Sequence, residues 1–370
     1  MILTEEECME RALELAARGA GLASPNPIVG AVIVRDGEVV GEGYHRFELL
    51  RHAEFYALDM AGARAKGATL YCTLEPCCHQ GRTPPCTDAL IEAGIARVVV
   101  AMIDPDSRVS GRGLEQLRRA GVAVEVGLLD RQAHRLNEGY VKFVSTGIPF
   151  VHAIEHYGEM APGAAPPNQG WSRGDAQSAR YDSEWIPSPA LVESAARYDA
   201  ILLGSLDWVN EAFASAYFAR ERHRSSIVAG QIYALKDLEP VIKGGTVLVL
   251  DDRTDSGPYQ GLERDPEPGA SESGKGWEVR HVPFARPSDF RGLLWVLAEL
   301  HVTSLAVLPG VTDISSIYDQ VDKVTVVRVP QPRGTTGRIV LPAGREITLR
   351  DIEETAAEGF VETTGYPVRK

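Results

Sequence analysis

The chain has 370 residues, 44% of them hydrophobic, and this length suits two domains of about 150 residues each. No apolar run reaches the roughly 18 residues of a membrane span, and the acidic N-terminal segment does not resemble a secretory signal, so we expect a cytoplasmic protein that binds no membrane. A net charge of −13 argues against a nucleic-acid partner and favours a small free substrate.

The first half of the chain alternates between helical and extended patterns. A helix is expected to begin at Thr4, because Glu7 completes a capping box and apolar residues then repeat at helical spacing. The other expected elements, in order, are strands at 28–34 and 38–43, a helix from 52, a strand at 68–73, a helix at 86–94, a strand at 97–103, a helix at 113–120 and a last strand at 122–126. This alternation predicts a three-layer α/β sandwich.

A domain boundary is predicted at Gly147-Ile148-Pro149, which gives domains at 1–147 and 148–370. Beyond it the composition changes, since all five Trp follow position 170 and no Cys occurs. The expected elements are strands at 151–156, 200–203, 246–250, 304–308 and 323–329, and helices at 189–197 and 287–301. The segments 158–184 and 251–275 are expected to be a long loop and a flexible surface insertion.

The strongest chemical signal lies between His52 and Cys86. His52-Ala53-Glu54 is followed by Pro76-Cys77 and, after eight intervening residues, by Cys86. One imidazole and two thiolates are three zinc ligands, and a catalytic zinc needs three protein ligands and an open fourth position. Glu54 is then free to move protons at the activated water, as in the zinc deaminases of nucleobases. Each residue alone is more often structural, so the prediction rests on the joint spacing.

The other cysteines give no sign of a disulfide framework. All five thiols fall within the first 86 residues, and an odd, clustered set in the cytosol is expected to stay reduced. Cys8 and Cys72 are expected to be inert core residues, whereas Cys78 neighbours a ligand without being assigned as one.

The zinc loop also carries a family resemblance. The run Thr-Leu-Glu-Pro-Cys-Cys-His-Gln-Gly-Arg-Thr-Pro-Pro-Cys at 73–86 closely resembles the deaminase half of the bifunctional riboflavin-biosynthesis deaminase/reductase family. Similar segments at 26–31, 41–45, 104–106 and 111–113 extend the resemblance over residues 1–147. It implies a cytidine-deaminase-like fold and hydrolytic deamination of a diaminopyrimidinone that carries a ribosylamino 5-phosphate.

Polar residues in the matching motifs are expected to hold this substrate. The residues are Asn26, His45, His79, Arg82, Asp104 and Asp106. Arg82 suits a phosphate because guanidinium binds it in bidentate fashion, and the two aspartates follow a strand end, where ligands bind in open α/β sheets. Asn26 could instead cap a turn, and Arg82 could simply be solvated. The family usually has Asn in place of Asp106, whose carboxylate would repel a phosphate.

The second domain resembles the family's reductase only faintly, which implies a dihydrofolate-reductase-like α/β fold. Tyr157 stands in place of an Asp, Asp207 in place of a Thr, and Pro309 within a turn that needs free N–H groups near cofactor phosphates. These substitutions predict a degenerate domain that neither binds NADPH nor reduces a substrate.

The leading hypothesis is therefore a zinc-dependent deaminase of riboflavin biosynthesis with an inactive reductase-like domain, expected to form a homo-oligomer through its C-terminal domain. One alternative is the full bifunctional enzyme, which would use NADPH. A second is a non-catalytic scaffold or regulatory binding protein, against which the intact set of zinc ligands and Glu54 argues. A third is a deaminase of a related pyrimidine.

Overall fold

A computed structural model describes residues 3–81, 83–157, 195, 197–203, 227–230, 245–251, 277–283, 290–308, 314–328, 338–340, 346–357 and 360–369. The chain separates into two compact units, Met1–Gly147 and Ile148–Lys370. Within the part of the chain that is described, no helix is long and apolar enough to cross a membrane.

The first unit is built on a five-stranded sheet with the strand order β2-β1-β3-β4-β5. The strands are β1 (Gly30–Arg35), β2 (Glu38–Tyr44), β3 (Thr69–Leu74), β4 (Arg97–Met102) and β5 (Ala123–Val126). β1 is antiparallel to β2 and β3, whereas β3, β4 and β5 run parallel to one another. The carboxyl ends of β3 and β4 are therefore neighbours at one edge of the sheet.

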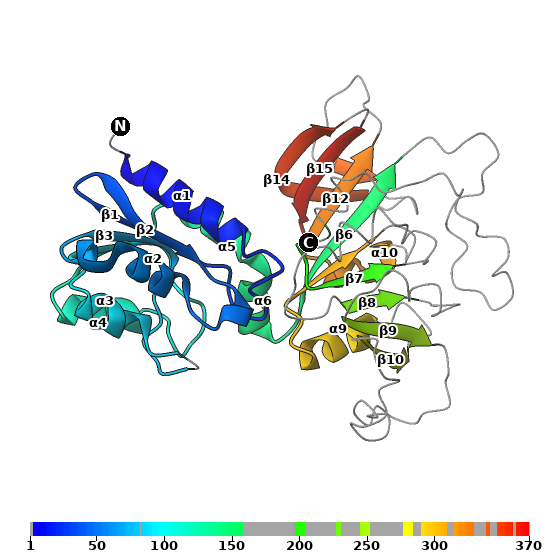
Figure 1. The fold of residues 1–370 in the computed structure, drawn as a ribbon. Helices are drawn as coiled ribbons and strands as arrows, with labels where there is room; N and C mark the ends of the chain where they lie inside the picture. The colour runs from blue at the N-terminus through cyan, green and yellow to red at the C-terminus, as the bar shows by residue number, and fades with distance from the viewer. Residues whose placement is uncertain are drawn as a thin grey trace, which may run out of the picture. The chain divides into compact units, whose positions relative to one another are not determined.

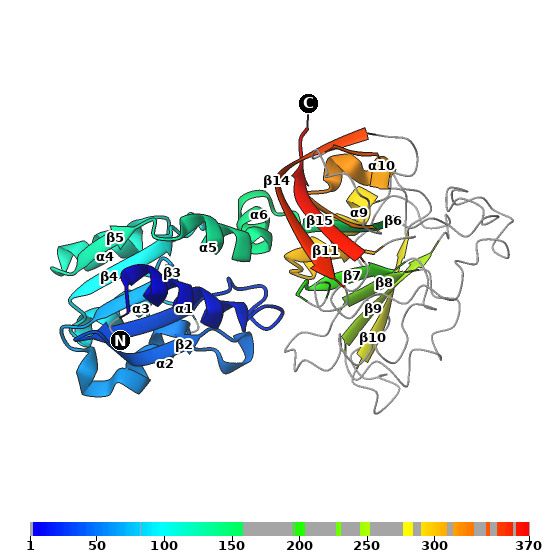
Figure 2. The ribbon, with the colours of Figure 1, turned by 90° about the horizontal axis from the view of Figure 1, so that it is seen from above.

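Helices cover both faces of this sheet (Figures 1 and 2). α1 (Glu5–Ala17) and α5 (Asp130–Leu136) pack on one face, and α2 (Ala53–Ala61), α3 (Cys86–Glu92) and α4 (Arg112–Arg119) follow one another across the other. The unit also contains α6 (Glu138–Thr146) and the short 3-10 helices η1 (Phe47–Leu49) and η2 (Gly62–Ala65). The predicted three-layer sandwich is confirmed.

Local signals account for some of these elements and fail for others. The capping box is present, since the Glu7 amide donates to Thr4 Oγ1 over 3.2 Å and the Thr4 amide donates to the Glu7 carboxylate over 2.7 Å. α5 and α6 were not predicted. α5 is only seven residues long and buries a single residue, Ala133, and α6 buries none fully, so neither carries a strong apolar pattern.

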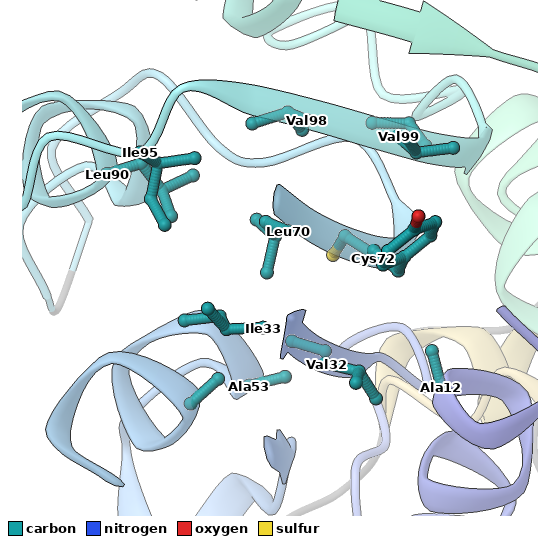
Figure 3. Close-up of a cluster of buried hydrophobic side chains, with 14 of the residues drawn as sticks. Ala12, Val32, Ile33, Ala53, Leu70, Cys72, Leu90, Ile95, Val98 and Val99 are labelled. Carbon is teal, nitrogen blue, oxygen red and sulfur yellow. The ribbon is translucent and has the colours of Figure 1, made fainter. Parts of the chain in front are cut away.

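The core of the first unit lies between the sheet and its helices (Figure 3). Side chains of Val32, Leu70 and Val98 from three neighbouring strands are fully buried, and Ala12 of α1 and Ala53 of α2 pack against this cluster. Small residues let the helices approach the strands closely. A Cβ added to Gly41 of β2 would lie 2.0 Å from the carbonyl oxygen of Ala57 in α2, so no larger residue fits there.

We expect Gly41→Ala to destabilise the first unit. The added methyl meets helix backbone that cannot move aside, and overpacking of this kind costs about 1–3 kcal/mol. In thermal unfolding, the transition of the first unit should fall by about 2–4 °C for each kcal/mol. Gly81→Ala is the matched control, because its added Cβ meets no heavy atom within 4 Å. Equal melting temperatures for the two variants would contradict the close approach of α2 and β2.

The second unit contains a ten-stranded sheet with the order β10-β9-β8-β7-β11-β6-β12-β15-β14-β13. The strands, in chain order, are β6 (Phe150–Tyr157), β7 (Ala200–Leu203), β8 (Ile227–Gly230), β9 (Gly245–Asp251), β10 (Trp277–Pro283), β11 (Ser304–Val307), β12 (Lys323–Arg328), β13 (Arg338–Val340), β14 (Glu346–Ala357) and β15 (Phe360–Pro367). β6 runs parallel to both of its neighbours, β11 and β12, and β15 is antiparallel to β12 and β14.

The helix α9 (Phe290–Glu299) buries Phe290, Leu293 and Leu297 in the core of the second unit, and α10 (Ile314–Ile317) and the 3-10 helix η6 (Tyr318–Gln320) precede β12. The predicted strands now seen as β6, β7, β9, β11 and β12 are confirmed, as is the helix α9. β8, β10, β13, β14 and β15 were not predicted. The predicted loop and insertion, and all but two residues of the helix at 189–197, lie outside the described residues.

Candidate functional site

Three side chains that can hold a metal converge beside the carboxyl end of β3. His52 is the N-cap of α2, Cys77 lies three residues beyond β3, and Cys86 is the first residue of α3. His52 Nδ1 lies 3.2 Å from Cys86 Sγ and 3.4 Å from Cys77 Sγ. The three ligand atoms all lie within 4.8 Å of one another. One imidazole and two sulfurs at this spacing fit a tetrahedral zinc with an open fourth position.

The two sulfurs differ in their electrostatic surroundings. Hydrogen bonding from Cys86, and then the nearby His52, lowers the pKa of the Cys77 thiol to about 4. The backbone amide of Cys86 also donates to Cys77 Sγ over 3.4 Å. Burial raises the pKa of the Cys86 thiol well above its usual value. The Cys77 thiol therefore loses its proton more readily than the Cys86 thiol, and both must be thiolates to hold a divalent metal.

Glu54 lies in the first turn of α2, two residues after His52, and is only 3% exposed. Burial raises the pKa of its carboxyl group, and the charge of His52 opposes that shift. Its Oε2 atom is buried and has no hydrogen-bond partner among the described residues. Leaving a buried polar atom unsatisfied costs about 1–3 kcal/mol, more for a charged group, so this oxygen is open to a partner from outside the chain.

His45 and Asn26 stand behind the imidazole of His52. The rings of His45 and His52 meet edge to face with centroids 5.4 Å apart. Burial lowers the pKa of His45 to about 4, so the ring is neutral near pH 7. The contact of His45 Nδ1 with the Arg51 carbonyl oxygen, at 2.9 Å, makes Nδ1 the donor, and Asn26 Nδ2 donates to His45 Nε2 over 3.0 Å. These two predicted residues therefore lie within one hydrogen-bonded group beside the candidate metal site.

Asp104 and Asp106 follow β4, as the sequence predicts. Asp104 Oδ1 accepts hydrogen bonds from the Tyr140 hydroxyl over 3.0 Å and from the Asp106 amide over 2.9 Å. Burial raises the pKa of Asp104 to about 6 despite these bonds. Tyr140, on α6, was not predicted as part of this region, because its contact with Asp104 spans 36 residues.

Asp106 forms an ion pair with Arg108, which lowers the pKa of Asp106, and the nearby His79 contributes to the same shift. His79 is half-buried, and its Nδ1 atom has no hydrogen-bond partner within the described part of the chain. Arg82 lies outside the described residues, as do Asp207 and Pro309 of the second unit. For Tyr157 only the backbone is described, as the last residue of β6.

A residue that the sequence did not single out, Glu75, joins the loops around the site. Its buried carboxylate accepts backbone N–H groups from the loop after β4 and from the start of α4: Asp104 at 3.3 Å, Gly111 at 2.8 Å, Gly113 at 2.9 Å and Leu114 at 3.4 Å. Glu75 lies two residues before Cys77. Glu75 follows an apolar strand and precedes Pro76-Cys77, and a charged residue at such a buried position must find hydrogen-bond partners. This position was the signal from which the sequence could have predicted its role.

Comparisons with known proteins agree with this geometry. Residues 3–102 match the family model described as the cytidine and deoxycytidylate deaminase zinc-binding region. The chain is 50% identical over 187 residues to the riboflavin biosynthesis protein RibD of Escherichia coli, a match that covers 50% of this chain and 47% of that protein. It is 48% identical over 141 residues to the diaminohydroxyphosphoribosylamino-pyrimidine deaminase of Buchnera aphidicola, covering 38% of this chain and 96% of that protein.

Solved structures resemble the whole chain. RibD from Acinetobacter baumannii has a TM-score of 0.66 at 26% identity, with 98% of this chain and 99% of that chain covered. A diaminohydroxyphosphoribosylaminopyrimidine deaminase/5-amino-6-(5-phosphoribosylamino)uracil reductase from Thermotoga maritima has a TM-score of 0.69 at 25% identity, with 98% of each chain covered. In sequence, by contrast, the match spans about half the length of the E. coli relative.

The fold of the first unit and its group of His and Cys donors define the class of zinc-binding, cytidine-deaminase-like proteins. Within that class, the chain belongs to the RibD family of riboflavin-biosynthesis deaminase/reductases, through its diaminohydroxyphosphoribosylaminopyrimidine deaminase half. The predicted fold class, a cytidine-deaminase-like domain followed by a dihydrofolate-reductase-like α/β domain, is confirmed by the likeness to RibD over the whole chain.

We expect protein purified without added metal to contain about one zinc per chain, because three ligands at this spacing form one tetrahedral site. Elemental analysis measures the content directly. Cys86→Ser should lose most of the metal, since a hydroxyl does not replace a thiolate as a zinc ligand. Cys78→Ser is the matched control and should keep it, because Cys78 is outside the group of converging donors. Undiminished zinc in Cys86→Ser would remove Cys86 from the site.

Proposed function

We propose that the chain catalyses zinc-dependent hydrolytic deamination of a diaminopyrimidinone that carries a ribosylamino 5-phosphate. His52, Cys77 and Cys86 would hold the zinc. The observation that carries the proposal is the buried Glu54 carboxylate, which has an unpartnered oxygen beside three converging metal donors. The match to the Buchnera deaminase covers 96% of that protein, and this similarity supports a diaminopyrimidinone as the substrate.

When bound, zinc supplies the acidity that brings the pKa of a water molecule to near 7. Glu54 moves the protons: Oε2 takes one from the attacking water and delivers it to the ring nitrogen. Water oxygen then forms a bond to the amine-bearing ring carbon. Glu54 passes the second water proton to the amino group, the carbon–nitrogen bond breaks, and ammonia leaves. A positioned acid–base group of this kind contributes on the order of 10²–10⁴ in rate.

The residues around Glu54 would bind and orient the pyrimidine ring of the substrate. Neutral His45 cannot repel a metal cation held by His52, and its bond to Asn26 sets the direction of the Asn26 amide. Burial raises the pKa of Asp104 to about 6, so its carboxyl group can share a proton with a ring amine or a ribose hydroxyl at the end of β4. We assign Asn26, His45, His79, Arg82, Asp104 and Asp106 to substrate binding on their motifs.

We expect Glu54→Gln to abolish deamination while leaving the zinc in place. Gln keeps the size and much of the hydrogen-bonding shape of Glu but cannot act as a general base or acid near pH 7, so turnover should fall by about 10²-fold or more. Ammonia release and zinc content are measured on the same preparation. Glu115→Gln is the matched control, because it changes an exposed carboxylate on α4 and should keep both turnover and zinc. Near-normal turnover in Glu54→Gln would exclude Glu54 as the proton carrier.

We further propose that the second unit no longer acts as a reductase. Three substitutions relative to the reductase motifs support this: Tyr157 in place of Asp, the negatively charged Asp207 in place of Thr, and Pro309, which has no backbone N–H to offer a cofactor phosphate. The second candidate function is the complete deaminase and NADPH-dependent reductase. The likeness to the Thermotoga deaminase/reductase over 98% of both chains favours it.

We expect titration of the protein with NADPH to show no binding in the micromolar range. A lost hydrogen bond to a charged group costs about 1.5–3 kcal/mol, and each 1.4 kcal/mol is about tenfold in affinity. The variant Asp207→Thr combined with Pro309→Gly should bind more tightly than the parent protein. Micromolar binding by the parent, with NADPH oxidation when the deaminated product is added, would establish the bifunctional enzyme.

A further inference from the structure

The loop between β4 and α4 lies at the same edge of the sheet as the candidate metal site. Near the start of this loop, the Asp104 amide donates a hydrogen bond to the carboxylate of Glu75. Glu75 lies two residues before Cys77 in the sequence. Because β3 and β4 are paired up to Leu74 and Met102, the residues that follow both strands emerge side by side. Asp106 and Arg108 are part of this loop, and His79 of the zinc loop is near enough to act on the charge of Asp106.

Asp106 and Arg108 are joined by more than a single contact. Arg108 Nε lies 3.0 Å and 2.9 Å from the two carboxylate oxygens of Asp106, and Nη2 lies 2.5 Å from Oδ2. The backbone amide of Arg108 also donates to Asp106 Oδ1 over 2.8 Å. The Asp106 side chain is 10% exposed and that of Arg108 is 73% exposed. The carboxylate is thus covered, while the guanidinium faces solvent.

The backbone that carries Arg108 is fixed on both sides. Val109 is buried, and its amide donates to the Asp106 carbonyl over 2.8 Å. The Arg112 amide donates to the Val109 carbonyl over 2.8 Å, and the Gly111 amide donates to the Glu75 carboxylate over the same distance. A guanidinium on such a loop is held in place before any ligand arrives, which lowers the entropy lost on binding.

The ion pair between Asp106 and Arg108 is not explained by a contribution to the stability of the fold. An ion pair whose guanidinium is mostly exposed to solvent adds little to stability, and Arg108 is mostly exposed. Guanidinium has five N–H donors in a planar fork, and Asp106 engages only the side formed by Nε and Nη2. Among the described residues, the side-chain hydrogen bonds of Arg108 come from Nε and Nη2, which leaves the N–H groups of Nη1 for a second anion.

Carboxylates crowd this edge of the sheet, which is unfavourable for an anionic substrate. Asp104 and Asp106 follow β4, and Glu54 lies beside the metal donors, so a phosphate approaching them needs a compensating cation. Arg108 neutralises Asp106 and still presents free donors. The family usually has asparagine at position 106, and an unpaired aspartate there would repel a phosphate. The ion pair with Arg108 cancels this repulsion.

We propose that Arg108 is a specificity-determining residue that binds the phosphate monoester of the substrate, and that Asp106 acts as the positioning residue that orients its guanidinium. This inference rests on the proposed deaminase function for the identity of the substrate. The two residues act as a unit. Without Arg108, the carboxylate of Asp106 is left facing the phosphate and repels it.

The first test compares deamination of the phosphorylated pyrimidine with that of its dephosphorylated counterpart. Arg108→Gln should lower the preference for the phosphorylated substrate, as the ratio of kcat/KM values, by about tenfold or more, mainly through KM. Arg119→Gln is the matched control, because Arg119 is as exposed as Arg108 and forms an ion pair with Glu115 on α4. An unchanged preference in Arg108→Gln, or an equal loss in Arg119→Gln, would overturn the proposal.

The second test uses the coupling between the two residues. In Asp106→Asn combined with Arg108→Gln, the repelling carboxylate is gone but the guanidinium is still missing, so only part of the preference lost in Arg108→Gln should return. This rescue separates an electrostatic role from a structural one, because a loop damaged by Arg108→Gln would be damaged further by the second change. A double variant as poor as, or poorer than, Arg108→Gln would contradict the pairing.

A binding measurement separates this proposal from the proposed function. Ribose 5-phosphate is titrated calorimetrically into the parent protein and into Arg108→Gln, with ribose as the uncharged reference. Binding that needs the phosphate and weakens by about tenfold in Arg108→Gln supports the site even when the parent protein shows no deamination. Equal binding of ribose 5-phosphate by both proteins overturns the site even when the parent protein deaminates normally.

Discussion

One buried carboxylate, that of Glu75, connects the parts of the first unit on which its chemistry depends. A buried charge is costly unless hydrogen bonds satisfy it, and here the loop after β4 and the first turn of α4 supply N–H donors, aided by the helix dipole. The packing is equally close, since a Cβ on Gly113 would lie 2.2 Å from the Pro76 carbonyl oxygen. The loop that carries Cys77 and the loop that carries Asp104 therefore share one anchor, and neither can shift without the other.

Around that anchor, the first unit satisfies its buried polar groups almost everywhere except where a ligand is expected. His45 has partners on both ring nitrogens, Asp104 accepts from Tyr140, and Asn137 is bonded to the backbone of Ile28. In the described part of the unit, the buried side-chain atoms without partners are Glu54 Oε2 and His79 Nδ1. A preorganised site keeps polar atoms free for its ligand while the polar groups around them are satisfied by the protein. Glu54 and His79 fit this description.

The sequence predicted those features that local patterns encode. His52 and Glu54 meet at the start of α2 because both lie at a helix N-terminus, where side chains two residues apart can converge. Contacts between distant segments were not predictable in the same way. α5 and α6 meet at Asn137, which is 1% exposed and bonds to Ile28 across 109 residues, so these helices depend on tertiary contacts more than on their own patterns. The same reason hid the role of Glu75, whose partners lie 29 to 39 residues further along the chain.

The placement of β6 has a consequence for how the chain folds as it leaves the ribosome. All strands of the first sheet lie within residues 30–126, so that sheet can form while synthesis continues. β6 is made next, but its neighbours in the sheet, β11 and β12, begin only at Ser304 and Lys323. At about 5–20 residues per second, this strand waits roughly 7 to 30 s for a partner. During that interval both of its edges are open to other chains, and unpaired strand edges of this kind are prone to aggregation.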